Sequence, residues 1–78
     1  MRDQSEIQYW RIAEICNRLG SGITMERIPT ELGRLFIRFH IVGMARKPEW
    51  NGAASVLALK SDDEVAATLR KIGVPLSD

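Results

Sequence analysis

The segment from residue 29 to residue 60 places the strongest constraint on the fold of this 78-residue chain. Apolar side chains recur through residues 32–42 and stop at Gly43. A turn-forming stretch over residues 48–52 follows, and residues 56–59 form a second, short apolar run. Proline, glycine and asparagine in such a stretch are strong signals for chain reversal. The segment therefore predicts two regular elements separated by a turn, and the nature of the first element decides the fold.

Residues 30–42 admit two interpretations. A helix that begins after Pro29 would gather one apolar stripe from Leu32, Leu35, Phe36, Phe39 and Val42. A strand would alternate an apolar face with a basic and aromatic face made of Arg34, Phe36, Arg38 and His40, which would suit single-stranded nucleic acid. We prefer the helix because its stripe is longer and accounts for the proline. The alternative pairs residues 34–44 with residues 53–60 in an α-β-β-α arrangement.

Both ends of the chain predict helices. The spacing of apolar residues predicts a first helix over residues 4–19, with a glycine directly after it. Ser61 and Glu64 form a capping box at the start of a last helix, which Gly73 ends. Residues 24–28, between these helices, predict no more than a short turn. We therefore expect one domain over the whole chain, of the α+β class, with helices and a β-hairpin.

Composition limits the classes of function. Hydrophobic residues make up 45% and charged residues 27% of the chain, as in globular domains. No apolar run approaches the length of a bilayer span and no signal peptide opens the chain, so we expect a cytoplasmic protein without membrane contact. The single cysteine, Cys16, is expected in the core. Helix capping explains the acidic residues 62–64, and His40 is the only histidine. We expect no catalysis, no cofactor and no metal ion.

The order of helix, glycine, basic residues, turn and apolar run resembles a winged helix-turn-helix DNA-binding domain over about residues 12–60. The resemblance implies a recognition helix over residues 30–42 that ends at a glycine. It also implies a first wing strand over residues 44–47, a wing loop over residues 48–54 and a second strand over residues 55–60. On this interpretation the protein is a DNA-binding regulator of transcription.

The resemblance also implies a DNA-contacting surface. Residues 1–47 carry eight basic and five acidic side chains, a net charge of +3. The residues expected to contact the major groove, the phosphates or the minor groove of duplex DNA are Arg27, Thr30, Arg34, Arg38, Arg46, Lys47 and Asn51. Because one short recognition helix has limited affinity, a homodimer is expected.

A second hypothesis is a protein-binding inhibitor or adaptor, of the sort carried by phages and mobile elements, that acts on a larger host protein. The near-neutral net charge of +1 favours it. Trp10 lies off the apolar stripe of the first helix and would serve as an anchor, unless the last helix covers it. Ile37 and Ile41 flank the arginines on the face that a DNA reader exposes. Trp50, in the turn, would either contact the partner or brace the loop.

Overall fold

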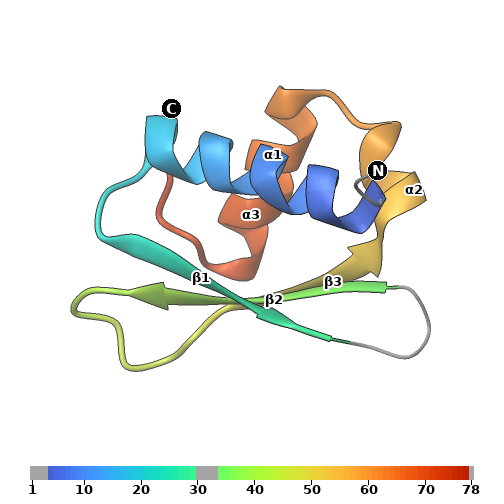
Figure 1. Cartoon of the computed structure of the whole chain (residues 1–78). Coiled ribbons are helices and arrows are strands. Elements are labelled where there is room, and N and C mark those ends of the chain that lie inside the picture. Colours follow the sequence, from blue (N-terminus) through green and yellow to red (C-terminus); the bar gives the residue numbers. More distant parts are fainter. Residues whose placement is uncertain (1–3, 30–33, 78) are drawn as a thin grey trace.

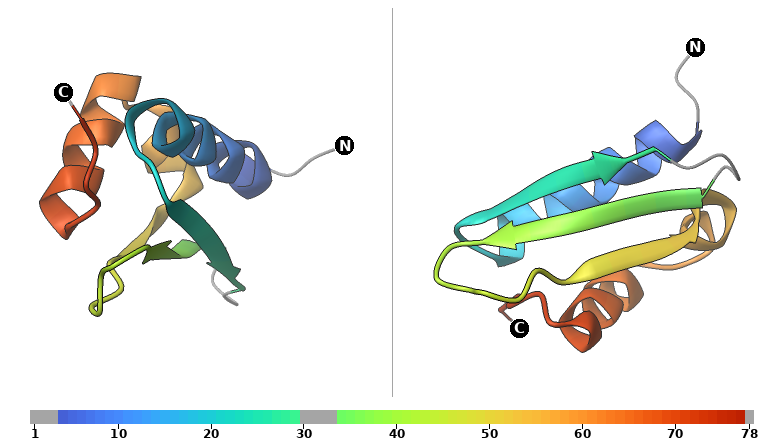
Figure 2. Two further views of the ribbon diagram at one scale, coloured as in Figure 1. Left: turned by 90° about the vertical axis from the view of Figure 1, so that its left-hand side faces the viewer. Right: turned by 90° about the horizontal axis from the view of Figure 1, so that it is seen from below.

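The computed structural model describes residues 4–29 and 34–77. The elements follow the order α1 (Gln4–Leu19), β1 (Ile23–Ile28), β2 (Arg34–Ile41), β3 (Glu49–Ala53), α2 (Ala54–Ala58) and α3 (Asp62–Ile72). The strands form one antiparallel sheet in the order β1-β2-β3. All three helices lie on the same side of this sheet (Figures 1 and 2). The predicted α+β class is confirmed.

Local chemistry sets the ends of the two longer helices. α1 covers Gln4–Leu19, the residues predicted. At the start of α3 the Ser61 hydroxyl accepts a hydrogen bond from the Glu64 amide at 3.2 Å, the first half of the predicted capping box. Gly73 ends α3 with a φ of 111°, a left-handed conformation that glycine adopts without a steric penalty. These two helices are confirmed because their signals lie within one or two turns of each boundary.

The preferred helix over residues 30–42 is wrong for its described part. Residues 34–41 form β2, the central strand, and residues 30–33 lie outside the described residues. Leu35, Ile37 and Phe39 point into the core from β2, and the alternate residues occupy the opposite face. β1, in a region expected to form only a short turn, pairs with one edge of β2, and β3 pairs with the other. Pairing on both edges satisfies the backbone of β2, so the β-branched and aromatic residues of this segment adopt the extended conformation that suits them.

The wing elements are wrong as well. Residues 44–47 form no strand, and residues 54–58 form α2, in place of the second wing strand. The chain reverses near Gly43, which has a φ of 82°. The Asn51-Gly52 pair, expected in a turn, lies inside β3, where Asn51 is opposite Phe36 of β2. The alternative interpretation, a strand over residues 34–44, is therefore closer to the structure than the helix. It expects the paired strand at residues 53–60, whereas β2 pairs with β3, Glu49–Ala53.

The hydrophobic core fills the space between the inner face of the sheet and the helices. Its buried members are Ile12, Ile15, Cys16, Leu35, Ile37, Phe39, Leu57, Val65, Ala66, Leu69, Val74 and Leu76. Burial raises the pKa of the Cys16 thiol to about 11, so the thiol stays protonated at neutral pH and packs as a small apolar group. The predicted burial of Cys16 is confirmed. No helix among the described residues has the length and apolar composition that a membrane span requires.

Candidate protein-binding surface

Large hydrophobic side chains are exposed on α1 and on α2, which pack against each other. The four that define this α1–α2 surface, with their exposed fractions, are Ile7 (51%), Trp10 (56%), Val56 (52%) and Leu59 (86%). Leu59 is the C-cap residue of α2. Figure 1 shows α2 beside the first half of α1. Single exposed apolar residues are ordinary on protein surfaces, whereas several from two packed helices are typical of an interaction site.

Arg11 holds α2 in place against α1. Its guanidinium donates to the carboxylate of Asp62 at 2.9 Å, to the carbonyl oxygen of Leu57 at 2.9 Å and to the carbonyl oxygen of Lys60. A five-residue helix such as α2 has no intrinsic stability, and no side chain caps its N-terminus. The Arg11 contacts at its C-terminal end and the burial of Leu57 therefore fix α2, and with it the exposed positions of Val56 and Leu59.

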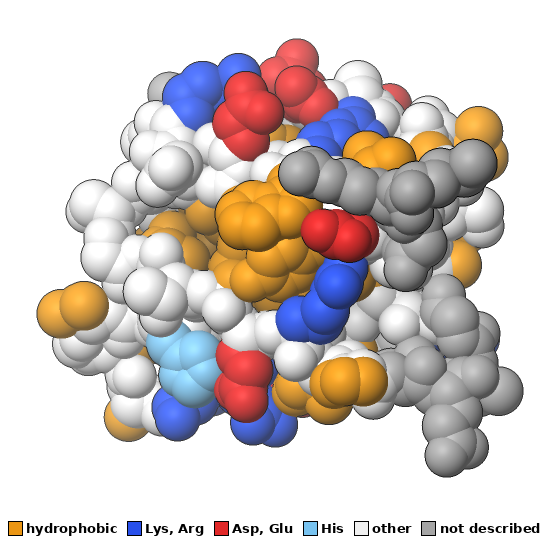
Figure 3. Space-filling view, in the orientation of Figure 1, with side chains coloured by type: hydrophobic (Ala, Val, Ile, Leu, Met, Phe, Trp, Pro, Cys, Tyr) orange, Lys and Arg blue, Asp and Glu red, His pale blue; other side chains and the backbone are white. Residues whose placement is uncertain are grey.

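Trp10 is braced from the side facing the sheet. The Tyr9 and Trp10 rings meet edge to face, with centroids 5.5 Å apart. The Tyr9 hydroxyl donates to the carbonyl oxygen of Met25 at 3.3 Å, and the Arg27 guanidinium lies 5.2 Å from the centre of the Tyr9 ring. Figure 3 shows a group of hydrophobic side chains at the centre of the view, between α1 and β1. The structure therefore leaves the predicted anchor Trp10 exposed and supported; α3 does not cover it.

The other predicted protein contacts do not share this exposure. Ile37 is completely buried on the inner face of β2, so its prediction as a contact residue is wrong. Ile41 and Trp50 are partly buried against the core. Trp50 was expected in a turn but lies in β3, where its ring packs against Gly52 of the same strand; an added Cβ at Gly52 would sit 2.9 Å from the ring. Sequence reasoning missed Val56 and Leu59 because it assigned them to a strand.

The predicted DNA contacts are divided among different faces. Arg34, Arg38 and Asn51 lie on the outer face of the sheet, which no helix covers (Figure 2). Arg27 lies on the helix side against Tyr9. Arg46 and Lys47 lie in the loop between β2 and β3. The predicted contact Thr30 lies outside the described residues. These side chains therefore form no single surface of the kind that a recognition helix and a wing would present.

On the outer face, charges of opposite sign are paired across all three strands. Arg38 on β2 contacts Glu49 on β3 at 2.8 Å and Glu26 on β1 at 3.6 Å, and His40 Nε2 lies 3.0 Å from the same Glu26 oxygen. The hydrogen bond from His40 lowers the pKa of Glu26, and the charges of Arg38, His40 and Lys47 act in the same direction. Glu26 and Glu49 therefore offset the positive charge that was expected to contact DNA on this face.

Within the described residues no three His, Cys, Asp or Glu side chains are placed to hold a metal ion.

The chain matches no protein-family model, no curated protein and no solved structure in the comparisons made.

Proposed function

We propose that this chain is a non-enzymatic binding domain whose α1–α2 surface docks on an apolar surface of another protein. The observation that carries the proposal is the exposure of four large hydrophobic side chains, Ile7, Trp10, Val56 and Leu59, on two helices that pack together and are joined by Arg11. Tryptophan is enriched among the residues that dominate binding energy at interfaces. Burying the exposed half of such a side chain contributes about 2–3 kcal/mol to an association.

The organisation of this surface favours protein binding over the reading of DNA bases by a recognition helix. Residues 34–41, expected to enter the major groove, are the central strand of the sheet, and Arg38 among them is paired with two carboxylates. A domain that binds a larger protein needs only a rigid, partly apolar surface. An inhibitor or adaptor of this kind acts by occupying its partner's surface.

Site-specific photo-crosslinking tests the proposal. A benzophenone amino acid placed at Leu59 should give an adduct with one other protein in the native cells. The same amino acid at Ala67, which is exposed on α3, serves as the matched control. The substitution Trp10→Ala should reduce the Leu59 adduct because it removes the anchor from the neighbouring helix.

Three results would contradict the proposal. They are the absence of any adduct from Leu59, equal adducts from Leu59 and Ala67, and an adduct formed only with a second copy of the chain. The last result would assign the α1–α2 surface to self-assembly.

A further inference from the structure

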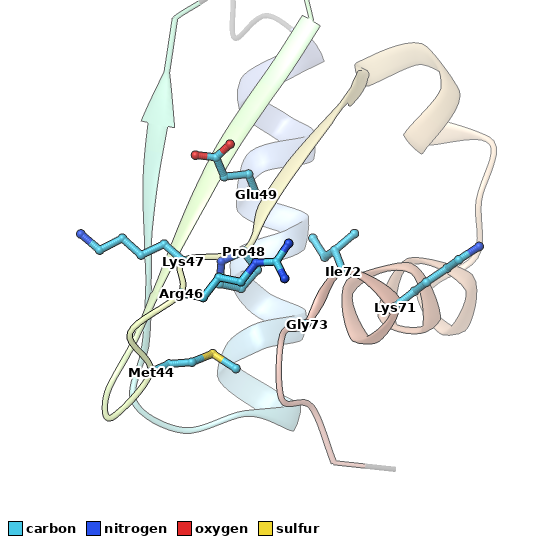
Figure 4. A pocket seen from close by; sticks show the side chains of 8 residues that line it. All are labelled: Met44, Arg46, Lys47, Pro48, Glu49, Lys71, Ile72 and Gly73. Atoms are coloured by element: carbon cyan, nitrogen blue, oxygen red, sulfur yellow. The ribbon is translucent and has the colours of Figure 1, made fainter.

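A basic hollow lies between the β2–β3 loop and the C-terminal end of α3 (Figure 4). Figure 1 shows that this loop and α2 lie at opposite ends of the molecule. It has a volume of about 840 Å³. Three cationic side chains line it, Arg46 and Lys47 from the loop and Lys71 from α3, together with one carboxylate, Glu49. Chain order gave no reason to associate Lys71 with the loop residues, so sequence reasoning missed it.

Among the described residues, no salt bridge of 4 Å or less joins Arg46, Lys47 or Lys71 to a carboxylate, and Lys47 acts on Glu26 only through a longer-range charge interaction. In the described part of the chain, the salt bridges of arginine, lysine and histidine join Arg11 to Asp62, Arg38 to Glu26 and Glu49, and His40 to Glu26. None involves a cation of the hollow. Glu49 already accepts from Arg38 at 2.8 Å, so much of its charge is offset. A ligand that carries negative charge would supply what this surface lacks.

The arrangement of the cations suits an extended polyanion better than a small anion. In Figure 4, Lys47 and Lys71 extend toward opposite sides, and Arg46 lies over Pro48 between them. A single phosphate is held by donors that converge on it, whereas a nucleic-acid backbone presents phosphates in a row. None of the described residues that line the hollow is aromatic, so they offer no ring on which an unpaired base could stack; the apolar ones are Met44, Pro48 and Ile72. This composition favours a duplex over a single strand.

We propose that the basic hollow binds the phosphate backbone of duplex DNA without reading the base sequence. The contacts are made by Arg46, Lys47 and Lys71. This inference does not depend on the proposed protein binding, because the α1–α2 surface lies at the other end of the domain (Figure 1). A protein partner and a DNA duplex would therefore be able to bind at the same time.

Fluorescence anisotropy with a labelled mixed-sequence duplex and the full chain tests the proposal. Binding should be saturable at low salt. With three phosphates neutralised, affinity should fall about 40-fold between 50 and 200 mM NaCl. The double variant Arg46→Ala, Lys71→Ala should reduce affinity at 50 mM NaCl about tenfold or more and flatten the salt dependence. The control pair Arg18→Ala, Lys60→Ala removes the same charge elsewhere and should change affinity by less than about threefold.

Several outcomes would overturn the proposal. One is the lack of saturable binding by the unmodified protein even at 20 mM NaCl, a measurement that needs no variant. Another is an equal loss in the two double variants, which would assign binding to net charge alone. Tighter binding to the single strand of the same sequence would also reject a duplex site. Circular dichroism of both variants establishes that they retain the fold.

Discussion

The outer face of the sheet and the α1–α2 surface both face solvent. They differ in that the charged side chains of the outer face have partners within the domain, whereas the large apolar side chains of the α1–α2 surface are left uncovered. On the outer face, Arg38 forms salt bridges with Glu26 and Glu49, and His40 contacts Glu26, so these side chains are paired across three strands. On the α1–α2 surface, Trp10 and Leu59 are more than half exposed. The difference teaches that a basic residue in the sequence does not by itself mark a binding site. The side chains that lack cover in the folded chain are better candidates.

The largest expected effect compares the two faces of β2. Phe39→Ala should reduce the free energy of unfolding by about 3–5 kcal/mol, because Phe39 is completely buried. Phe36→Ala should cost about 1 kcal/mol or less, because Phe36 lies on the outer face and is only partly covered. Urea denaturation measures both. A helix over this segment would place both rings on one side. Equal losses in the free energy of unfolding for the two variants would therefore contradict the assignment of residues 34–41 to a strand with one buried and one outer face.

The next effect concerns the support of the α1–α2 surface. Arg11→Ala should lower the free energy of unfolding by about 2–3 kcal/mol, because it leaves the carbonyl groups of Leu57 and Lys60 and the Asp62 carboxylate without their donor. Thermal unfolding should show a decrease in Tm of about 10–20 °C for a domain of this size. The exposed Arg18→Ala is the matched control, and its Tm should change by no more than a few degrees. Equal changes would show that Arg11 does not hold α2.

Substitution on the α1–α2 surface should separate binding from stability. Trp10→Ala should weaken binding to a crosslinked partner about 30-fold, the effect of losing about 2 kcal/mol at an interface. Its cost in folding stability should be about 1 kcal/mol, because the Tyr9 ring contact is the interaction that the described structure assigns to this side chain. Isothermal titration calorimetry and urea denaturation measure the two quantities. A large loss of stability with unchanged binding would make Trp10 a structural residue.

The smallest effect lies in the outer-face network. The folded state lowers the pKa of Glu26 below its ordinary value of 4.5, so Glu26 stabilises the fold above that value. This contribution is lost as the pH falls through the lowered pKa. Glu26→Gln should therefore be slightly less stable than the unmodified protein at pH 6, and the difference should be smaller at pH 3. Glu14→Gln, outside the network, should match the unmodified protein at both pH values in urea denaturation. A difference for Glu26→Gln that is as large at pH 3 as at pH 6 would contradict the titration of this carboxyl group.

The candidate site was predicted only in part. Trp10 stood out because the apolar period of α1 leaves it off the buried stripe, and that period depends on one helix alone. Ile37 was expected on the surface because a helix over residues 34–41 would expose it. The strand that these residues form places it in the core. Val56 and Leu59 were missed because residues 55–60 were expected to form a strand, whereas residues 54–58 form α2. Lys71 joined Arg46 only when α3 folded back beside the β2–β3 loop.

The sequence by itself determined the two longer helices and the α+β class. A helix forms its hydrogen bonds between residues four apart, so Ser61, Glu64 and Gly73 determine where α3 begins and ends without help from the rest of the chain. Only the tertiary structure decided the conformation of residues 34–41. The backbone of a strand must pair with distant segments, here Ile23–Ile28 and Glu49–Ala53, and no local pattern in β2 specifies those partners.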